Sequence, residues 1–457
     1  MLRLTFDAGT LVLHGLAAPP ADALAPALVW DPRIAKYRAP AYRYRDLAQW
    51  LRGRNEDAAN DVFQARARTD QWQPPDLRPY QHAALLAWQM AKRCGLVVLP
   101  TGSGKTRLAC AAMAAVRCSA LCLVATRVLL HQWRDEIARH YHGPIGCLGD
   151  GEQRIEHITV ATMEGAYRRM AKLGNRFGLL IVDEAHHFGG GIRDEALEMC
   201  AAPLRLGLTA TTPGTAPLAR LVDLLGPVVC SLSIADLAGE WLADFDTIEL
   251  SLSLTPSERQ QYQLATKCFR EAFDSFRAIN PRAAWRDFVA LAARSEAGKA
   301  ALAAFRFSRR LTSYHDAKRR AVAALLARHR CNRVLIFTAD NATAYTIARE
   351  HLVMPITCDV DRAERDQALA AFRAGELRTL VSARVLNEGL DVPDADVAIV
   401  VGGVSGAREH VQRVGRLLRP APGKRALVYE LVAAGTHEVA KAAERRRALG
   451  HAATPPR

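Results

Sequence analysis

The sequence predicts an α/β protein with two tandem parallel-sheet domains, a small α+β domain before them and a helical insertion in the second. The prediction depends on two series of short apolar stretches that alternate with helical stretches of about 10 to 15 residues. One series starts near residue 80 and the other after about residue 330. Strands buried on both faces of a parallel sheet have this continuously apolar pattern. With 457 residues, 50% of them hydrophobic, the chain is long enough for two or three such cores.

The chain is basic, with 61 Lys and Arg against 47 Asp and Glu and a net charge of +14. This excess indicates a polyanionic partner, with nucleic acid ahead of an acidic membrane surface. The ten cysteines form no C-x-x-C pair, so we expect reduced core residues of a cytosolic protein. We find no signal-peptide pattern and no uninterrupted apolar run long enough to span a bilayer, so neither secretion nor membrane insertion is expected.

Residues 1–75 are predicted to form the small N-terminal domain. The stretch "LRLTFDAGTLVLHG" alternates apolar and polar residues around Asp7-Ala8-Gly9, which predicts a β-hairpin. A helical pattern follows, and the prolines of "QWQPPDLRP" indicate a linker. Two functions of this segment stay open, contact with nucleic acid and support of the next domain. Both depend on interleaved arginines and tyrosines, namely Arg33, Arg38, Arg43 and Arg45 with Tyr37, Tyr42 and Tyr44.

Residues 76–240 are predicted to form the first parallel-sheet domain, with strands at "GLVVLP", "ALCLVAT", "HITVAT", "GLLIVDE" and "LRLGLTAT". After the first strand, "LPTGSGKT" (99–106) predicts a phosphate-binding loop that opens a helix. Glycines in such a loop let backbone amides point at an anion. Lys105 can then reach the phosphates, and the Thr106 hydroxyl can ligate magnesium. Leu99 departs from the strict G-x-x-x-x-G-K-[ST] pattern, but the tight turn Thr101, Gly102, Ser103, Gly104 is retained.

The stretch "IVDEAHHF" (181–188) places two carboxylates and two histidines after a buried strand. Zinc is disfavoured because two histidines that ligate one metal from a helix lie about four residues apart. A structural polar turn and one half of a nucleotide site remain as interpretations, and we favour the second. Strand ends of a parallel sheet meet at its carboxyl edge. Asp183 would hold magnesium together with Thr106, and Glu184 would orient and deprotonate the attacking water. His186 would link the γ phosphate to the neighbouring strand end at 209–211.

Residues 241–457 are predicted to form the second parallel-sheet domain, with strands at "RVLIFTA", "RTLVSA", "DVAIVVG" and "RALVYELV". Between residues 256 and 330 the pattern changes to helical spacing of aromatic and apolar residues, which Asn280-Pro281 breaks into two helices. This span holds 16 Lys or Arg against 6 Asp or Glu, a net charge of +10. It is either the solvated face of a helical linker or a nucleic-acid grip, and the interleaved aromatics favour the grip.

The stretch "HVQRVGRLLRP" (410–420) supplies arginines to a transition state for phosphoryl transfer. Arg413, Arg416 and Arg419 lie on one predicted short helix, and Arg416 and Arg419 share a face because they are three residues apart. If that face lines a cleft between the two sheet domains, both contact the γ phosphate. The alternative is a set of surface arginines in exposed ion pairs.

Taken together, these stretches resemble superfamily 2 helicases, and within them the XPB-type (Rad25-like) DNA helicases. The motifs occur in family order from residue 77: "LRPYQ" (77–81), "PTGSGKT" (100–106), "TRVLLHQW" (126–133), "VATMEGA" (160–166), "DEAHH" (183–187), "LTAT" (208–211), "IFTAD" (336–340), "VLNEGLDVPDADVAI" (385–399) and "QRVGRLLRP" (412–420). The N-terminal segment resembles the family's damage-recognition domain, and the basic helices, about 256–316, resemble its DNA-gripping thumb.

The resemblance implies two RecA-like domains, ATP and Mg²⁺ as cofactors, and DNA as partner. It implies that Gln81 reads the adenine edge with support from Arg78, that Gly389 and Asp391 couple ATP to DNA, and that Gln412 joins the catalytic set. DNA contacts are implied for Thr126, Arg127 and Thr162, and in the thumb-like helices for Arg306, Arg309 and Arg310.

The expected activity is ATP-dependent 3′–5′ DNA helicase or translocase action in DNA repair, on single-strand/duplex junctions, by a monomer in the nucleoid-associated cytoplasm. One departure bears on unwinding, because Thr212-Pro213-Gly214-Thr215-Ala216 stands where the family has an Arg-Glu-Asp triplet. A double-strand translocase without processive unwinding therefore stays open as an alternative. A DNA-binding scaffold that recruits a nuclease is a second alternative, and a nuclease partner is possible in either case.

Overall fold

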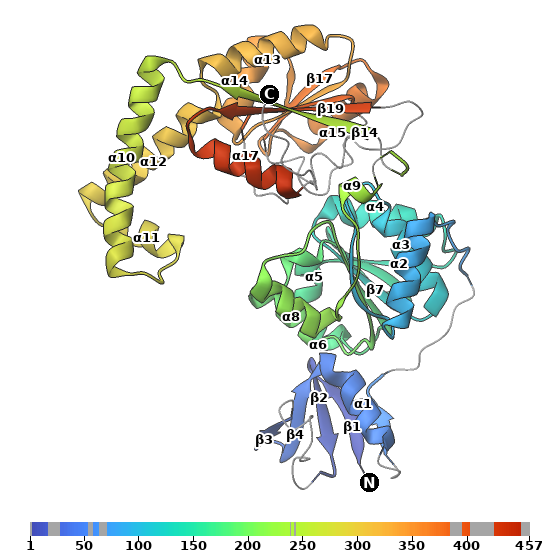
Figure 1. Ribbon diagram of the computed structural model, residues 1–457. Helices are drawn as coiled ribbons and strands as arrows, with labels where there is room; N and C mark the ends of the chain where they lie inside the picture. Colours follow the sequence, from blue (N-terminus) through green and yellow to red (C-terminus); the bar gives the residue numbers. More distant parts are fainter. Residues whose placement is uncertain are drawn as a thin grey trace. The chain divides into compact units, whose positions relative to one another are not determined.

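The computed structural model describes residues 2–16, 28–53, 58–63, 71–237, 239–241, 244–383, 395–402 and 425–448. The chain divides into two compact units, residues 1–233 and 234–457 (Figure 1). Each contains a parallel sheet with helices on its faces, which confirms the predicted fold class. The predicted domain boundaries near residues 75 and 240 stay predictions.

The first unit begins with a small five-stranded sheet of order β3-β4-β2-β1-β5. Its strands are β1 (Arg3–Asp7), β2 (Thr10–His14), β3 (Val29–Asp31), β4 (Lys36–Pro40) and β5 (Ala59–Asp61), and α1 (Tyr44–Gly53) follows β4 after one 3₁₀ turn. The predicted hairpin is confirmed, since Asp7 pairs with Thr10 and the two turn residues, Ala8 and Gly9, have φ of 47° and 87°. Positive φ at both central residues is the geometry that matches the twist of a two-residue hairpin.

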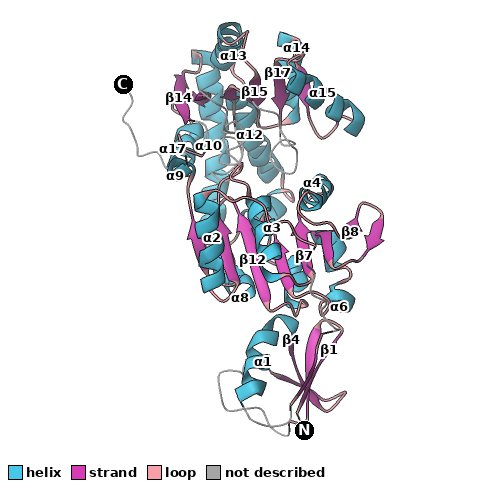
Figure 2. Cartoon of the chain, turned by 90° about the vertical axis from the view of Figure 1, so that its right-hand side faces the viewer, coloured by secondary structure: helices cyan, strands magenta, loops and turns pink. Residues whose placement is uncertain are grey.

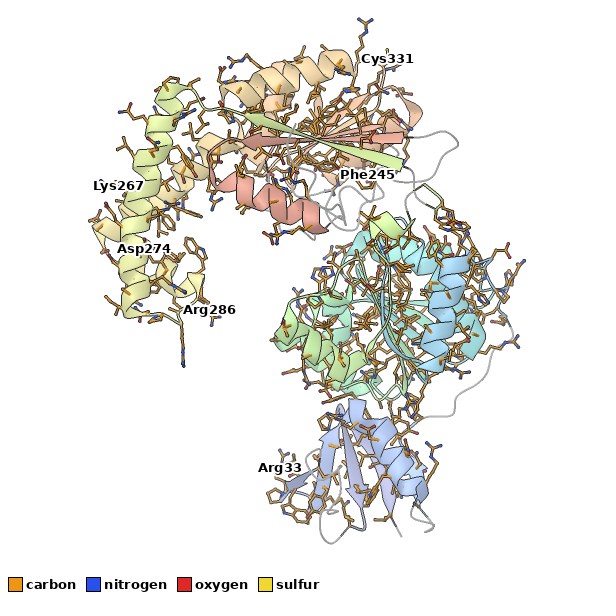
Figure 3. The ribbon with its side chains drawn as sticks, in the orientation of Figure 1. Arg33, Phe245, Lys267, Asp274, Arg286 and Cys331 are labelled. Atoms are coloured by element: carbon orange, nitrogen blue, oxygen red, sulfur yellow. The ribbon has the colours of Figure 1, made fainter. Side chains whose placement is uncertain are left out.

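The small sheet is held to the parallel sheet of its own unit by polar contacts. Asp223 accepts hydrogen bonds from Tyr42 Oη at 2.9 Å and from the Arg43 guanidinium at 2.7 Å. The Arg45 guanidinium donates to the Lys92 carbonyl at 3.1 Å. Three of the interleaved arginines and tyrosines, Tyr42, Arg43 and Arg45, therefore support the parallel-sheet part of this unit. Arg33, in contrast, is 82% exposed, and its partner among the described residues is the nearby Asp31 (Figure 3).

The parallel sheet of the first unit has the order β13-β6-β12-β11-β7-β10-β8-β9, and all its neighbours are parallel except β8 and β9. Its strands are β6 (Cys94–Val98), β7 (Ala120–Val124), β8 (Ile145–Gly149), β9 (Glu152–Arg154), β10 (Ile158–Thr162), β11 (Leu179–Val182), β12 (Leu204–Thr209) and β13 (Val228–Ser231). The principal helices are α2 (Pro79–Met90), α3 (Lys105–Val116), α4 (Arg127–Ala138), α5 (Met163–Tyr167), α6 (Met170–Leu173), α7 (Glu195–Glu198) and α8 (Thr215–Leu225). Figure 1 shows α2 and α3 on one side of this sheet and α5 and α8 on the other, and Figure 2 turns the same sheet toward the viewer.

The second unit contains a six-stranded parallel sheet of order β14-β19-β18-β15-β17-β16. Its strands are β14 (Asp244–Leu252), β15 (Val334–Phe337), β16 (Met354–Ile356), β17 (Thr379–Ser382), β18 (Val397–Val400) and β19 (Arg425–Ala433). Its helices outside the basic insertion are α9 (Ile234–Leu237), α13 (Asp316–Arg328), α14 (Asn341–His351), α15 (Arg362–Ala374) and α17 (His437–Ala448).

The basic insertion consists of α10 (Pro256–Ile279), α11 (Trp285–Ala292) and α12 (Glu296–Ser313), which we call the thumb. The predicted break at Asn280-Pro281 is confirmed. The prediction of two helices over 256–330 is wrong, because α11, α12 and α13 follow α10. The missed boundary is at Ser295, whose hydroxyl accepts the Gly298 amide at 3.1 Å and so caps a new helix start.

The cysteine prediction is partly wrong. All ten are free thiols, as expected for reduced residues, but Cys268, Cys331 and Cys358 are exposed rather than buried. Cys268 lies on α10, and Cys331 and Cys358 lie in the turns after α13 and β16. No helix among the described residues is long and apolar enough to cross a membrane.

Candidate active site

The loop between β6 and α3 has the backbone geometry of an anion site. Gly102 and Gly104 adopt φ of 85° and 76°, and Gly104 directly precedes the first residue of α3. No side chain caps this helix N-terminus. The first backbone N–H groups of α3 are therefore available to a ligand, and the helix dipole favours a negative one.

The side chains of this loop also fit a phosphate group. Lys105 Nζ donates to the carbonyls of Leu99 at 3.2 Å and Pro100 at 3.4 Å, so the ammonium is held at the loop. The buried Thr101 hydroxyl has no hydrogen-bond partner among the described residues. An unsatisfied buried hydroxyl costs free energy, which a ligand oxygen can recover. Thr106 lies in the first turn of α3.

Residues in the first turn of α2 hold this loop through hydrogen bonds. Tyr80 Oη and Gln81 Nε2 both donate to the Ser103 carbonyl at 2.7 Å, and Gln81 Oε1 accepts the Arg78 backbone N–H at 2.9 Å. Gln81 is only 2% exposed. Its amide is thus occupied by protein contacts in this structure, and its reading of an adenine edge stays a prediction. The support from Tyr80 was not anticipated from the sequence.

Asp183 and Glu184 follow β11 at the carboxyl edge of the same sheet. Asp183 Oδ2 accepts a hydrogen bond from Trp133 Nε1 at 2.9 Å, and Asp183 Oδ1 accepts the Glu184 backbone N–H at 3.0 Å. Glu184 has a left-handed backbone with φ 47°, which is uncommon for glutamate and turns the chain sharply after the strand. Strained backbone of this kind clusters at functional sites.

The two carboxyl groups titrate differently. Burial, together with the adjacent Glu184 carboxylate, raises the pKa of Asp183 to about 6. Burial also acts to raise the pKa of Glu184, but the His186 hydrogen bond and the Lys105 charge outweigh it and lower that pKa to about 2. Lys105 lowers the pKa of both groups, so its charge acts on the two carboxylates from across the loop. Glu184 is ionised at neutral pH.

His186 joins this strand end to the neighbouring one. Its Nδ1 lies 3.3 Å from Glu184 Oε2 and 3.2 Å from Thr209 Oγ1. Thr209 ends β12, which lies between β6 and β11 in the sheet, and its hydroxyl donates to the Thr211 carbonyl at 2.9 Å. The loop after β6 and the acidic turn after β11 therefore flank one strand end. Thr106 and Asp183 offer the hydroxyl and carboxylate oxygens that suit magnesium.

The predicted DNA contacts of the first unit lie on two adjacent strand ends of the same sheet edge. Thr126 follows β7 and caps α4, its hydroxyl accepting the Leu129 amide at 3.2 Å. Thr162 ends β10 and caps α5, its hydroxyl accepting the Gly165 amide at 3.1 Å. Both hydroxyls thus have a structural function, and the exposed Arg127 pairs with Asp150 at 3.5 Å. Contact with DNA stays a prediction for all three.

The predicted DNA contacts of the second unit lie on α12. Arg306 and Arg310 are exposed, and Arg309 is half-buried with its guanidinium 5.0 Å from the Phe305 ring centre. All three line a pocket of about 850 Å³ that also includes Lys441. Burial lowers the pKa of Arg309, and burial and the Arg309 charge lower that of Lys441. Mutual repulsion among cations of this kind is relieved by a polyanion.

Comparison with known proteins places these features in one family. The model of the xeroderma pigmentosum group B helicase damage recognition domain matches residues 4–62. The models of the type III restriction enzyme res subunit and of the helicase conserved C-terminal domain match residues 75–214 and 317–421. The "DNA 3'-5' translocase XPB2" of Sulfurisphaera tokodaii is 34% identical over 428 residues, covering 93% of this chain and 97% of that relative. The chain belongs to the XPB family.

Other similarities agree with membership of the XPB family. The "DNA 3'-5' helicase XPB" of Mycobacterium tuberculosis is 29% identical over 393 residues, and the match covers 83% of this chain and 64% of the relative. The helicase domain of Pyrococcus furiosus Hef has a similar fold, with a TM-score of 0.53 at 20% identity over 81% of this chain and 98% of that one. Dbp5 of S. cerevisiae gives a TM-score of 0.54 at 15% identity, over 82% and 88%.

Some predicted residues of this XPB-family chain lie outside the described residues. They are Gly389, Asp391, Gln412, Arg413, Arg416 and Arg419. Their functions stay predictions. Trp133, in contrast, was missed although it ends the quoted motif "TRVLLHQW". The only signal for it was a tryptophan at the end of an amphipathic pattern, which by itself indicates ordinary core packing.

Proposed function

We propose that this chain is an ATP-dependent DNA 3′–5′ helicase or translocase of the XPB family that acts in DNA repair. The proposal depends mainly on one observation. The glycine loop before α3, whose N-terminus has no side-chain cap among the described residues, lies at the same edge of a parallel sheet as the Asp183-Glu184-His186 turn. Phosphoryl transfer depends mainly on positioning and charge, and the chain provides both there. A DNA translocase works where the cell's DNA is, so the proposal includes a nucleoid-associated location.

Each residue then has a defined part. The amides of residues 102–106 and Lys105 hold the phosphates, while Thr106 and Asp183 hold magnesium, which supplies charge neutralisation. Glu184, ionised at neutral pH because its pKa is about 2, accepts a hydrogen bond from the attacking water and orients it. As the water attacks, its proton passes to the Glu184 carboxylate while the bond from the γ phosphorus to the leaving oxygen breaks. His186 fixes the Glu184 carboxylate relative to Thr209.

The charge distribution supports DNA as the polymer on which the motor moves. Arg306, Arg309 and Arg310 have no carboxylate partner among the described residues, and they line one pocket. Cations without partners gain most from releasing the counterions of a phosphate backbone. The proposal further includes a single-strand/duplex junction as the preferred site, a monomeric motor and an associated nuclease.

A translocase that does not unwind processively is the second candidate. The loop 212–214 runs directly into α8 without an Arg-Glu-Asp triplet. Strand displacement on a fork that scales with ATP turnover would favour the helicase, whereas triplex displacement without fork opening would favour the translocase. A scaffold in which nucleotide sets only conformation predicts that Glu184→Gln leaves turnover unchanged.

The decisive experiment measures phosphate release without DNA and with single strand, duplex and fork. We expect Lys105→Ala to lower DNA-stimulated hydrolysis by about 10²-fold or more, because the phosphates lose their main cation. DNA binding, measured by fluorescence anisotropy, should persist. The exposed Lys172 of the same unit provides the matched control, and Lys172→Ala should hydrolyse ATP like the wild type. Wild-type turnover in Lys105→Ala would refute the assignment.

A further inference from the structure

The thumb has an apolar core of its own. Phe276, Phe288, Ala292 and Leu302 form a buried cluster against which Phe269 and Phe273 pack. The core of the second sheet is a separate cluster, drawn from β15, β17, β18, β19, α13 and α14 together with residues that flank these elements. Because the described residues of the two clusters do not overlap, no shared apolar core sets the orientation of the thumb relative to the sheet.

The contacts at the base of the thumb are polar. The Glu258 carboxylate accepts the Thr255 backbone N–H at 2.9 Å and the Thr255 hydroxyl at 3.0 Å, which caps the start of α10. The other oxygen of the same carboxylate accepts the Asp316 backbone N–H at 3.2 Å, at the first residue of α13. One side chain thus ties together the two ends of the insertion.

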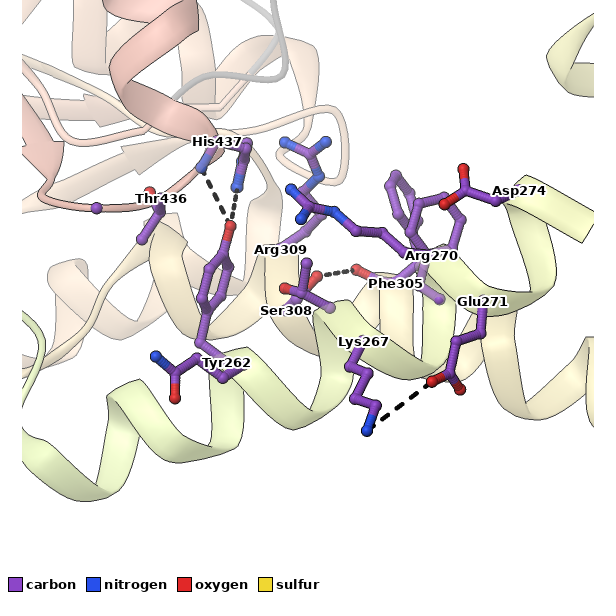
Figure 4. A pocket seen from close by; sticks show the side chains of 14 residues that line it. Tyr262, Lys267, Arg270, Glu271, Asp274, Phe305, Ser308, Arg309, Thr436 and His437 are labelled. Carbon is purple, nitrogen blue, oxygen red and sulfur yellow. Dashed lines mark hydrogen bonds and ion pairs between the residues drawn. The ribbon is translucent and has the colours of Figure 1, made fainter. Parts of the chain in front are cut away.

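One turn further along α10, Tyr262 reaches across to the turn between β19 and α17. Its hydroxyl accepts the His437 backbone N–H at 3.1 Å and lies 3.4 Å from His437 Nδ1, with the two rings stacked at 22°. A pocket of about 680 Å³ opens beside this contact, lined on one side by α10 and α12 and on the other by Gly435, Thr436 and His437 (Figure 4). The Tyr262 hydroxyl bridges the two walls of that pocket.

The turn that Tyr262 contacts is itself rigidly held. Glu438, next to His437, accepts Lys318 Nζ at 2.7 Å and the Ala433 backbone N–H at 2.9 Å. Lys318 Nζ also donates to the Val401 carbonyl at 2.6 Å, and both charged side chains are buried. Removing either member of such a buried pair leaves an uncompensated charge, so the turn is fixed to the ends of β18 and β19.

We infer that Tyr262 is a positioning residue that holds the thumb to the carboxyl edge of the second sheet, and that through this contact DNA bound at the thumb stimulates ATP hydrolysis. The inference rests on the proposed function. A single neutral hydrogen bond to a backbone N–H contributes modestly to stability, so it can orient the thumb without being needed for folding. The Glu258 cap and the Lys318–Glu438 pair cannot be removed without affecting folding, because both are integral to the fold.

The test is Tyr262→Phe, which removes only the hydroxyl. We expect the maximal DNA-stimulated rate of phosphate release to fall by about 2- to 10-fold, the range that corresponds to one hydrogen bond. DNA-independent hydrolysis, the DNA dissociation constant and the midpoint of thermal unfolding should match the wild type. Tyr345→Phe is the matched control, since the Tyr345 hydroxyl also makes a hydrogen bond within this unit, with the Thr357 hydroxyl at 2.9 Å, but away from the thumb.

Each other outcome has a defined meaning. Weaker DNA binding with an unchanged maximal rate would make Tyr262 a DNA contact and overturn the inference. If Tyr262→Phe lowers DNA-independent hydrolysis by the same factor, the effect is a general structural one and the inference is overturned. The inference is also overturned if Tyr262→Phe and Tyr345→Phe have equal DNA-stimulated rates. If the wild type shows no DNA stimulation, the proposed function fails, whereas stimulation that Tyr262→Phe leaves intact removes only this inference.

Discussion

At the residue scale, Trp133 shows how a side chain outside the glycine loop orients a candidate catalytic carboxylate, that of Asp183. Its indole is 1% exposed and donates to Asp183, a residue 50 positions away. The hydrogen bond favours the ionised carboxylate and leaves the other Asp183 oxygen to the Glu184 amide. Partners of this kind orient metal-ligating groups, and their loss commonly lowers metal affinity or activity by about 10- to 100-fold.

We therefore expect Trp133→Phe, which keeps the apolar bulk and removes the donor, to raise the magnesium concentration needed for half-maximal hydrolysis by about 10-fold. The measurement is phosphate release as a function of magnesium at saturating ATP and DNA. Trp88→Phe serves as control, because the Trp88 indole N–H bonds to the Arg205 carbonyl near the amino end of β12, whereas the acidic turn follows the carboxyl end of the parallel strand β11. A Trp133→Phe titration that overlays the wild type would show that the hydrogen bond only packs the core.

At the scale of elements, α12 combines two functions at successive turns along its length. Leu302 contributes to the thumb core, while Arg306 and Arg310 are exposed and Arg309 lies over Phe305. The helix therefore uses its Leu302 turn in folding and presents exposed arginines one and two turns further along to a ligand. The net positive charge of the insertion thus resides on a surface that the fold itself does not use.

Replacing Arg306, Arg309 and Arg310 with alanine should weaken DNA binding and reduce the slope of log affinity against log salt by about 1 for each DNA phosphate that is no longer neutralised. The measurement is anisotropy at several salt concentrations. The matched control removes the same charge from the same insertion at the exposed Arg282, Arg286 and Arg294, none of which lines that pocket. An equal change of slope in both triple variants would return the segment to the solvated-linker interpretation.

At the scale of the whole molecule, the fold accepts buried polar groups whose protonation affects stability. His315, at the start of α13, is 3% exposed, and neither ring nitrogen has a hydrogen-bond partner among the described residues. Burial and the nearby Lys318 charge lower its pKa below 6.5. In the unfolded chain the same imidazole takes up a proton near pH 6.5.

This difference predicts acid lability of the second unit. Since the unfolded state binds the proton more readily, stability is fully present above pH 6.5 and falls as the pH decreases below it, by up to about 1.4 kcal/mol per pH unit. His315→Leu should flatten the dependence of the unfolding midpoint between pH 7 and 5. The exposed His142 provides the control, so His142→Leu should retain the wild-type slope. Identical slopes in all three proteins would exclude His315 as the source.

Local pattern was sufficient for much of this protein. Apolar runs predicted two parallel sheets, "DAG" predicted the first hairpin, and Asn280-Pro281 predicted the end of α10. "PTGSGKT" and "DEAHH" predicted which strand ends carry the glycine loop and the acidic turn. The helix start at Ser295 was missed because apolar spacing continued across it. Periodicity and turn chemistry act over a few residues, so a linear sequence expresses them fully.

Only the tertiary structure decided which distant groups meet. Trp133 bonds to Asp183 across 50 residues, Lys318 pairs with Glu438 across 120, and Tyr262 contacts His437 across 175. Such pairs depend on strand order and helix placement, which no local window of sequence specifies. The sequence by itself therefore determined the kind of chemistry and the elements that bear it. The fold determined which side chains orient those groups, because orientation requires contacts that exist only after the strands have assembled.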